Sequence, residues 1–166
     1  MIAVDPGASG GIASMTVNGM VSAVKMPETE GDVLNLLRNL KTYHDTIFIE
    51  QVGGYIGGVG SPGSAMFNFG RGFGFLLGVA MSLNYRIEMV RPQTWQKALS
   101  LGNSKSMASK TEWKNKLKAE AQRRFPNLSV TLSTADALLI LEYGIHHTLR
   151  MAEGGSGSTI TKPSEE

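Results

Sequence analysis

Residues 2–26 read IAVDPGASGGIASMTVNGMVSAVKM, and this stretch predicts how the fold begins. The apolar run before Asp5 is a short strand that ends on a carboxylate and is followed by Pro-Gly. A second strand is expected over 10–17, where the Asn-Gly dipeptide that follows is a strong hairpin signal. A third strand is expected over 20–26. The chain therefore opens with a three-stranded meander whose first strand delivers Asp5 to one end of a sheet.

Helices and strands alternate in the remainder of the chain. Apolar residues from Val33 to Leu40 recur at helical spacing, with Asp32 as the expected N-cap. The other expected elements are a buried strand at 46–52, a glycine-rich loop at 53–64, a helix at 67–83, a strand at 85–90, a short helix from 92, a basic helix at 107–125 and a last helix at 134–150. This order predicts an α/β fold with a five-stranded mixed sheet flanked by helices.

One domain over 1–150 and a disordered tail over 151–166 are the expected organisation. The sequence has no cysteine, which excludes disulfides, thiolate metal sites and a cysteine nucleophile. Its longest apolar run, 73–83, is shorter than the ~20 residues of a membrane helix. Because Asp5 interrupts the first apolar segment, no secretory signal is expected, and a cytoplasmic protein without membrane contact is predicted.

Three acids stand at the ends of apolar segments. Asp5 ends the first strand, Glu50 ends the strand TIFIE, and Asp136 opens the last helix. The first and fourth strands can be parallel neighbours in this meander, which would bring Asp5 and Glu50 together. Carboxylates in such apolar surroundings are costly to bury unless they are paired or bound to a cation. Their convergence predicts Mg²⁺, which prefers oxygen ligands, and two such ions can cleave a phosphodiester.

A structural role is the alternative for two of these acids. Asp5 before Pro-Gly could cap a turn, and Asp136 could complement a helix dipole in the first turn. Glu50 is harder to explain in this way, because a strand interior rarely keeps a lone glutamate. The three acids together favour a site.

The three acidic motifs and the segments between them resemble the RuvC family of Holliday junction resolvases. IAVDPGASGGIA is similar to the family's opening strand and hairpin, IFIEQV to its second motif and STADALLILEYG to its last. AMFNFGRGFGFLLG and RPQTWQKALSLG, which lie between them, look like phage and bacterial members. The resemblance spans Ile2 to about Arg150. It implies an RNase H-like fold, with Asp5, Glu50 and Asp136 as catalytic acids that bind two Mg²⁺ ions, for which Mn²⁺ may substitute.

The sequence departs from the family at the fourth metal ligand. RuvC enzymes usually carry Asp or His one helical turn before the last acid, where this chain has Ser133. Glu142 is turned about 240° away from Asp136 on the helix, and His147 lies about 16 Å further along its axis. Ser133, a neighbouring threonine or water is therefore expected to complete the metal shell, with a weaker second site.

Basic residues are concentrated in one segment of a chain whose net charge is only +2. Seven of the sixteen lysines and arginines lie between 105 and 124, which suggests a polyanion-binding face, although a solvated helix face is the alternative. The resemblance implies DNA contacts and a lysine that assists catalysis, for which Lys114 or Lys110 is the match; we assign Lys114. The residues assigned to nucleic-acid binding are Lys105, Lys110, Lys114, Lys118, Tyr55 and Arg71. Tyr55 could stack on an unpaired base or anchor its loop.

The helix over 67–83 is the dimer interface that the family resemblance implies. Gly70, Gly74 and Gly78 fall on one face and would admit another backbone, although a deeply buried central helix is the alternative. The expected protein is a homodimeric junction resolvase acting on branched DNA in a bacterial cell or a phage-infected host, with a compact size that favours a phage. Two alternatives are a broader nuclease for branched DNA or RNA–DNA hybrids on the same fold, and a junction-binding protein that no longer cleaves.

Overall fold

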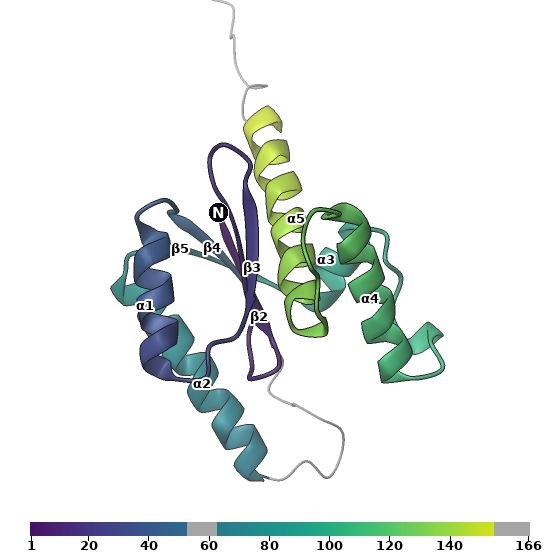
Figure 1. The fold of residues 1–166 in the computed structure, drawn as a ribbon, viewed down its shortest axis with the longest axis horizontal. Helices are drawn as coiled ribbons and strands as arrows, with labels where there is room; N and C mark the ends of the chain where they lie inside the picture. The colour runs from purple at the N-terminus through teal and green to yellow at the C-terminus, as the bar shows by residue number, and fades with distance from the viewer. Residues whose placement is uncertain (53–62, 155–166) are drawn as a thin grey trace, which may run out of the picture.

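The computed structural model describes residues 1–52 and 63–154, which form a five-stranded sheet with helices on both faces (Figure 1). The strands are β1 (Ile2–Asp5), β2 (Gly11–Met15), β3 (Val21–Lys25), β4 (Thr46–Glu50) and β5 (Arg86–Val90). The helices are α1 (Glu30–Lys41), α2 (Gly63–Ser82), α3 (Pro92–Ala98), α4 (Lys110–Arg124) and α5 (Leu132–Gly154), with a 3-10 turn, η1, at Ser104–Ser106. The predicted fold class is confirmed.

The sheet is mixed and has the strand order β3-β2-β1-β4-β5. β1, β2 and β3 form the antiparallel meander that the Asn-Gly turn predicts. β1 also pairs parallel with β4, and β4 pairs parallel with β5. Ala3 lies opposite Phe48 in the β1–β4 pair, so the two strands end side by side. The expected parallel pairing of the strands that carry Asp5 and Glu50 is therefore confirmed.

Alternate side chains of the central strands enter two separate apolar clusters. Ile2, Val4 and Ile49 belong to the cluster beneath α1 and α2. Ala3 and Phe48 belong to the cluster formed with α3, α4 and α5. Figure 1 shows α1 and α2 on one side of the sheet and the other three helices on the opposite side. This alternation follows from the two-residue period of a strand, and it decides on which face a terminal side chain emerges.

Helix α5 lies at the centre of the second layer. Every residue from 134 to 141 is buried, because α5 packs against β1 and β2 on one side and α4 on another. A helix that is apolar around its whole circumference is typical of an enclosed core element. Among the described helices, none combines the length and the apolar character that crossing a membrane requires.

Two helices begin at different residues from those predicted. Thr29, rather than Asp32, is the N-cap of α1, because its Oγ1 accepts from the Asp32 amide at 3.1 Å. The Asp32 carboxylate instead accepts a hydrogen bond from the Thr29 hydroxyl at 2.7 Å, so the two side chains are bonded to each other at the start of the helix. α4 begins at Lys110 rather than at 107, after Ser109, whose hydroxyl caps the Glu112 amide.

Two further helices are longer than predicted. α2 begins at Gly63, so the last two residues expected in the glycine-rich loop are helical. α5 begins at Leu132 and continues to Gly154, four residues past the predicted domain boundary at 150. The rest of the expected loop, 53–62, and the tail from 155 lie outside the described residues.

Helix α2 is largely exposed on the single chain. Only Leu76, Val79 and Ala80 are buried in it, and Phe67 is 69% exposed. The alternative that this helix is buried at the centre of the domain is therefore wrong. A Cβ added at any of its glycines would meet nothing within 4 Å, so no other part of the described chain uses the close approach that these glycines permit.

Candidate active site

The strands place Asp5 and Glu50 together on the α5 side of the sheet. Asp5 shares the face of Ala3, and Glu50 shares the face of Phe48, because alternate residues point the same way. The parallel register pairs Ala3 with Phe48 and Val4 with Ile49, so its continuation sets Asp5 opposite Glu50. Glu50 is only 9% exposed. Two carboxylates thus meet at the carboxyl ends of adjacent parallel strands.

The start of α5 brings Asp136 to the same place. The amide of Thr134 donates to the Thr131 hydroxyl, and the amide of Thr131 donates to the Thr134 hydroxyl, which fixes where the helix begins. Asp136 therefore lies in the second turn rather than the first, and the interpretation that it complements the helix dipole loses its basis. Gly11 permits the approach of α5, since a Cβ there would lie 2.5 Å from the Ser133 carbonyl oxygen.

Lys114 reaches this group of acids from α4. Its Nζ donates to Asp136 Oδ2 at 2.5 Å, and its side chain is half-exposed. Trp113 and Leu117, the neighbours on the inner face of α4, are buried in the core, and they fix the helix in place. Lys110 starts the same helix and is exposed. Of the two lysines that the sequence left open, Lys114 is the one in contact with a site acid.

The four side chains are close enough to alter one another's ionisation. The pKa of Asp5 is raised to about 8, first by burial and then by repulsion from Asp136 and Glu50, against the attraction of Lys114. Burial also raises the pKa of Glu50, against a hydrogen bond from Trp95. Burial acts to lower the pKa of Lys114, but attraction to the three carboxylates outweighs it and the net shift is upward. Ionising all three acids would therefore place more negative charge in the site than its one lysine can neutralise, and Asp5 keeps its proton at neutral pH.

The donor set suits a hard divalent cation. All three acids offer oxygen, which Mg²⁺ prefers, and Asp136 Oδ1 is buried without a hydrogen-bond partner. Over residues 1–52 and 63–154, however, no group of three or more His, Cys, Asp or Glu side chains is arranged to hold a metal ion as it stands. Two of the carboxylate oxygens already have partners, since Lys114 Nζ donates to Asp136 Oδ2 and the Trp95 indole donates to Glu50 Oε1. The donor types of the three acids nevertheless suit a hard cation, and Asp136 Oδ1 is open to one while Lys114 holds Oδ2.

The predicted fourth ligand and its substitutes lie as the helix geometry requires. Ser133 is half-buried at the start of α5, with its carbonyl directed at Gly11. Glu142 instead pairs with Arg124 at 3.4 Å, and His147 stacks on Tyr143. Neither of these two residues is among the groups that act on the site acids.

The residues assigned to nucleic-acid binding do not all lie together. Lys110 and Lys118 are exposed, one turn before and one turn after Lys114 on α4, and Lys105 is exposed on η1. Tyr55 lies outside the described residues. Arg71 is on α2, where its guanidinium pairs with Glu30 at 2.8 Å.

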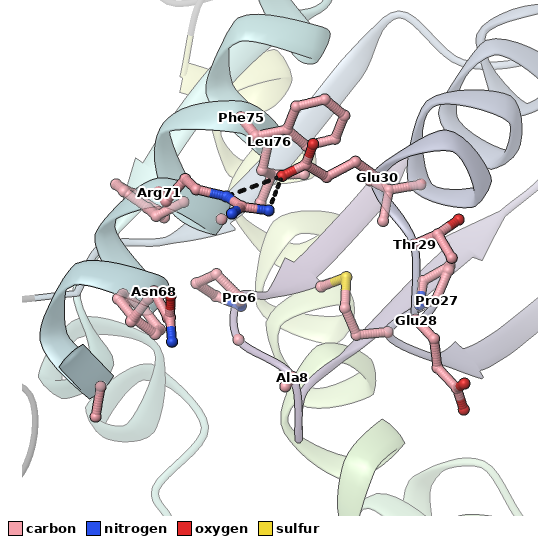
Figure 2. A pocket seen from close by; sticks show the side chains of 17 residues that line it. Pro6, Ala8, Pro27, Glu28, Thr29, Glu30, Asn68, Arg71, Phe75 and Leu76 are labelled. Atoms are coloured by element: carbon pink, nitrogen blue, oxygen red, sulfur yellow. Dashed lines mark hydrogen bonds and ion pairs between the residues drawn. The ribbon is translucent and has the colours of Figure 1, made fainter.

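Arg71 lines a separate pocket of about 420 Å³ between α1, α2 and the turn after β1. Figure 2 shows its guanidinium extended across this pocket toward Glu30, with Asn68 and Pro6 nearby. None of the three acids, nor Lys114, lines the pocket. The acidic cluster and this pocket are therefore different places on the molecule.

Two features of the site escaped sequence reasoning. Trp95, which is fully buried on α3, donates its indole Nε1–H to Glu50 Oε1 at 2.9 Å. The segment RPQTWQKALSLG carried the family resemblance, but nothing in it marked the indole as a partner of Glu50. Gly10 lies beside Asp5, where a Cβ would come within 2.1 Å of the Asp5 carbonyl oxygen. The paired glycines at 10 and 11 were the available signal for both close approaches.

Comparison with known proteins defines the fold. No protein-family model matches this chain, and no curated protein sequence matches it. Among solved structures, Thermus thermophilus RuvC is similar with a TM-score of 0.58 at 16% identity, covering 92% of this chain and 97% of that one. T. thermophilus RuvC in complex with a Holliday junction substrate gives 0.58 at 15% identity, over 91% and 96% of the two chains. These two structures do not support the expected phage origin. With its strand order and helical layers, the chain has the RuvC/RNase H-like fold.

Proposed function

We propose that this protein is a divalent-metal-dependent DNA endonuclease that resolves four-way junctions. The observation that carries the proposal is the convergence of Asp5, Glu50, Asp136 and Lys114 at one end of the sheet. A buried cluster with three acids and one lysine is costly to keep in a folded protein unless a cation or a reaction makes use of it. The RuvC-like fold and the junction-bound T. thermophilus RuvC structure support DNA as the substrate.

The carboxylates would hold the ions and Lys114 would act on the phosphate. Asp5, Glu50 and Asp136 supply only oxygen ligands, and Ser133 is the candidate for the remaining position. Mg²⁺ bound there, with Mn²⁺ as a substitute, would supply Lewis-acid chemistry that activates a water and stabilises the leaving oxygen. Lys114, once released from Asp136 Oδ2, carries a positive charge on a flexible stem beside the scissile phosphate. Its ammonium group can then stabilise the negative charge that develops on the phosphoryl oxygens.

The exposed lysines of α4 and η1 would bind the DNA backbone. Lys110 and Lys118 flank Lys114 on the same helix face, and Lys105 precedes the helix. Phosphate contacts of this kind dominate affinity for DNA and make it sensitive to salt. Arg71, in its ion pair with Glu30, and Tyr55 remain proposed contacts.

A homodimer formed through α2 would present two such sites to one junction. The exposed Phe67 and the open glycine face of α2 support this surface as the contact. A two-fold dimer matches the near two-fold symmetry of a four-way junction, so that two opposed strands are cut. The surroundings proposed for this activity are the cytoplasm of a bacterial cell or of a phage-infected host.

The test is a nicking assay on a labelled four-way junction with Mg²⁺. The proposal expects paired, symmetrical cuts by the wild-type protein and none by Glu50→Gln, which should still bind the junction because it loses a negative charge facing phosphate. Glu88→Gln is the matched control, since Glu88 pairs with Arg86 on the edge strand β5. Indiscriminate cutting would favour the broader nuclease, and a gel shift without cuts would favour the junction-binding protein. Normal cutting by Glu50→Gln would refute the metal site.

A further inference from the structure

Trp95 is a fully buried aromatic side chain that is hydrogen-bonded to an acid of the site. It lies on α3, a short helix that Pro92 starts, and its ring is 0% exposed. Its indole Nε1–H donates to Glu50 Oε1 at 2.9 Å in a buried hydrogen bond. The ring packs in the cluster that contains Phe48 and Trp113. The indole is therefore held by its neighbours, and it holds Glu50 in turn.

We propose that Trp95 is a positioning residue for Glu50, which fixes the carboxylate in the orientation that binds the cation. This inference rests on the proposed function, because it assigns a role within the same site. A tryptophan donates one hydrogen bond and accepts none, so its bond to Glu50 has a defined direction. A neutral donor to a carboxylate strengthens when that carboxylate is ionised, as a metal ligand must be.

The hydrogen bond divides the two oxygens of Glu50 between two tasks. Oε1 uses one of its lone pairs to accept the indole N–H, so Oε2 is the oxygen that is more open to a cation. A carboxylate that offers one oxygen suits Mg²⁺, whose near-octahedral shell demands well-placed single donors. Partners behind a metal ligand commonly set its orientation, and their loss lowers metal affinity by roughly 10–100-fold.

The other site acids show why Glu50 needs such a partner. Asp136 is anchored by the capped start of α5 and by Lys114. Glu50 has a longer side chain than an aspartate, so it loses more rotamer freedom when it is held in one position. The buried indole removes that freedom in advance, without adding a positive charge that would compete with the cation.

Metal binding by itself tests this role, before any DNA is cut. Tb³⁺ binds oxygen ligands, and its emission is sensitised by an indole a few ångströms away. The chain has two tryptophans, so Trp113→Phe leaves Trp95 as the single indole, and Trp95→Phe leaves Trp113. We expect sensitised emission to persist in Trp113→Phe, which is also the matched control for loss of a buried tryptophan. We expect calorimetry with Mn²⁺ to show affinity about ten-fold or more weaker in Trp95→Phe.

A purely structural role for Trp95 predicts a different pattern. It would lower the melting temperature of Trp95→Phe without changing Mn²⁺ affinity, and that result would overturn the inference. The loss of melting temperature that a packing role causes would also persist in the Glu50→Gln background, where we expect Trp95→Phe to have no further effect on Mn²⁺ binding. If Trp95→Phe does not fold, benzothienyl-alanine at position 95 keeps the ring shape and removes only the N–H donor.

The outcomes separate this inference from the proposed function. If the wild-type protein binds neither Mn²⁺ nor Tb³⁺, the proposed metal site and the role of Trp95 both fail. If the wild-type protein binds Mn²⁺ and cuts junctions while the benzothienyl-alanine variant binds Mn²⁺ equally well, only the role of Trp95 fails. Weaker binding by that variant, with an unchanged melting temperature, supports the inference.

Discussion

Replacing Asp5 by asparagine should stabilise the metal-free protein at neutral and alkaline pH. The folded chain raises the pKa of Asp5 from 3.8 to about 8, through burial and the repulsion of Asp136 and Glu50. Between these two pKa values the folded state binds a proton that the unfolded state has released. The free energy of unfolding therefore falls as the pH rises through this window. Once the pH exceeds the folded pKa, Asp5 contributes no further loss of stability.

The size of the effect follows from the width of that window. Each pH unit within it costs about 1.4 kcal/mol, so Asp5 removes about 4 kcal/mol of stability between pH 5 and pH 8. The pKa of Glu50 is raised as well, which adds to the slope in the same direction. Lys114 stays charged throughout, because its pKa lies above 10.5. The stability advantage of Asp5→Asn over the wild-type protein should thus be about 4 kcal/mol greater at pH 8 than at pH 5.

Urea unfolding in the presence of EDTA, from pH 5 to pH 8, measures this difference. Asp45→Asn is the control, because Asp45 is 92% exposed, pairs with Lys41 and lies away from the site. Adding Mg²⁺ should flatten the wild-type slope by favouring the ionised carboxylates, and it should have little effect on the slope of Asp5→Asn. Equal pH slopes for the wild-type protein and Asp5→Asn in EDTA would refute the view that these acids crowd one another.

Three more predictions concern the approach of α5, the metal shell and the dimer. Gly11→Ala should destabilise the fold by about 1–3 kcal/mol, because its Cβ would meet the Ser133 carbonyl, whereas Gly63→Ala should not. Equal melting temperatures for the two variants would contradict this prediction. Ser133→Asp should lower the Mg²⁺ midpoint of junction nicking by roughly ten-fold, since the added charge lies one turn before Asp136; identical midpoints would place Ser133 outside the metal shell. Gly74→Leu should give monomers in light scattering if α2 is the dimer contact, and a wild-type monomer at high concentration would contradict that surface.

The sequence predicted the strands of the site better than its helices. The apolar runs ending in Asp5 and Glu50 and the Asn-Gly turn are local signals, so the meander and the strand ends could be predicted from them. The N-cap of α1 and the start of α4 were misplaced by a few residues, because Thr29 and Ser109 were not identified as caps. Nothing in the sequence marked Thr131 and Thr134 as the pair that starts α5.

The contacts of the site were harder to predict than its members. That Lys114 rather than Lys110 touches Asp136 depends on how α4 packs against α5, and helical spacing alone leaves both lysines on one face. The hydrogen bond from Trp95 to Glu50 joins residues 45 positions apart, which no local pattern encodes. The exposure of α2 also depends on tertiary packing, since its composition is that of a core helix.

The central place of α5 has a consequence for how the protein is made. Its buried segment 134–141 covers one face of β1 and β2, which the ribosome synthesises first, near the N-terminus. Until those residues emerge, Ala3, Ala13 and Phe48 have no helix to cover them, and a nascent chain exposes a bare apolar sheet. The same helix brings Asp136, so the three acids meet only when it docks. A chain that is incompletely synthesised or partly folded therefore cannot assemble the acidic cluster, and whatever chemistry the cluster performs begins only with the complete fold.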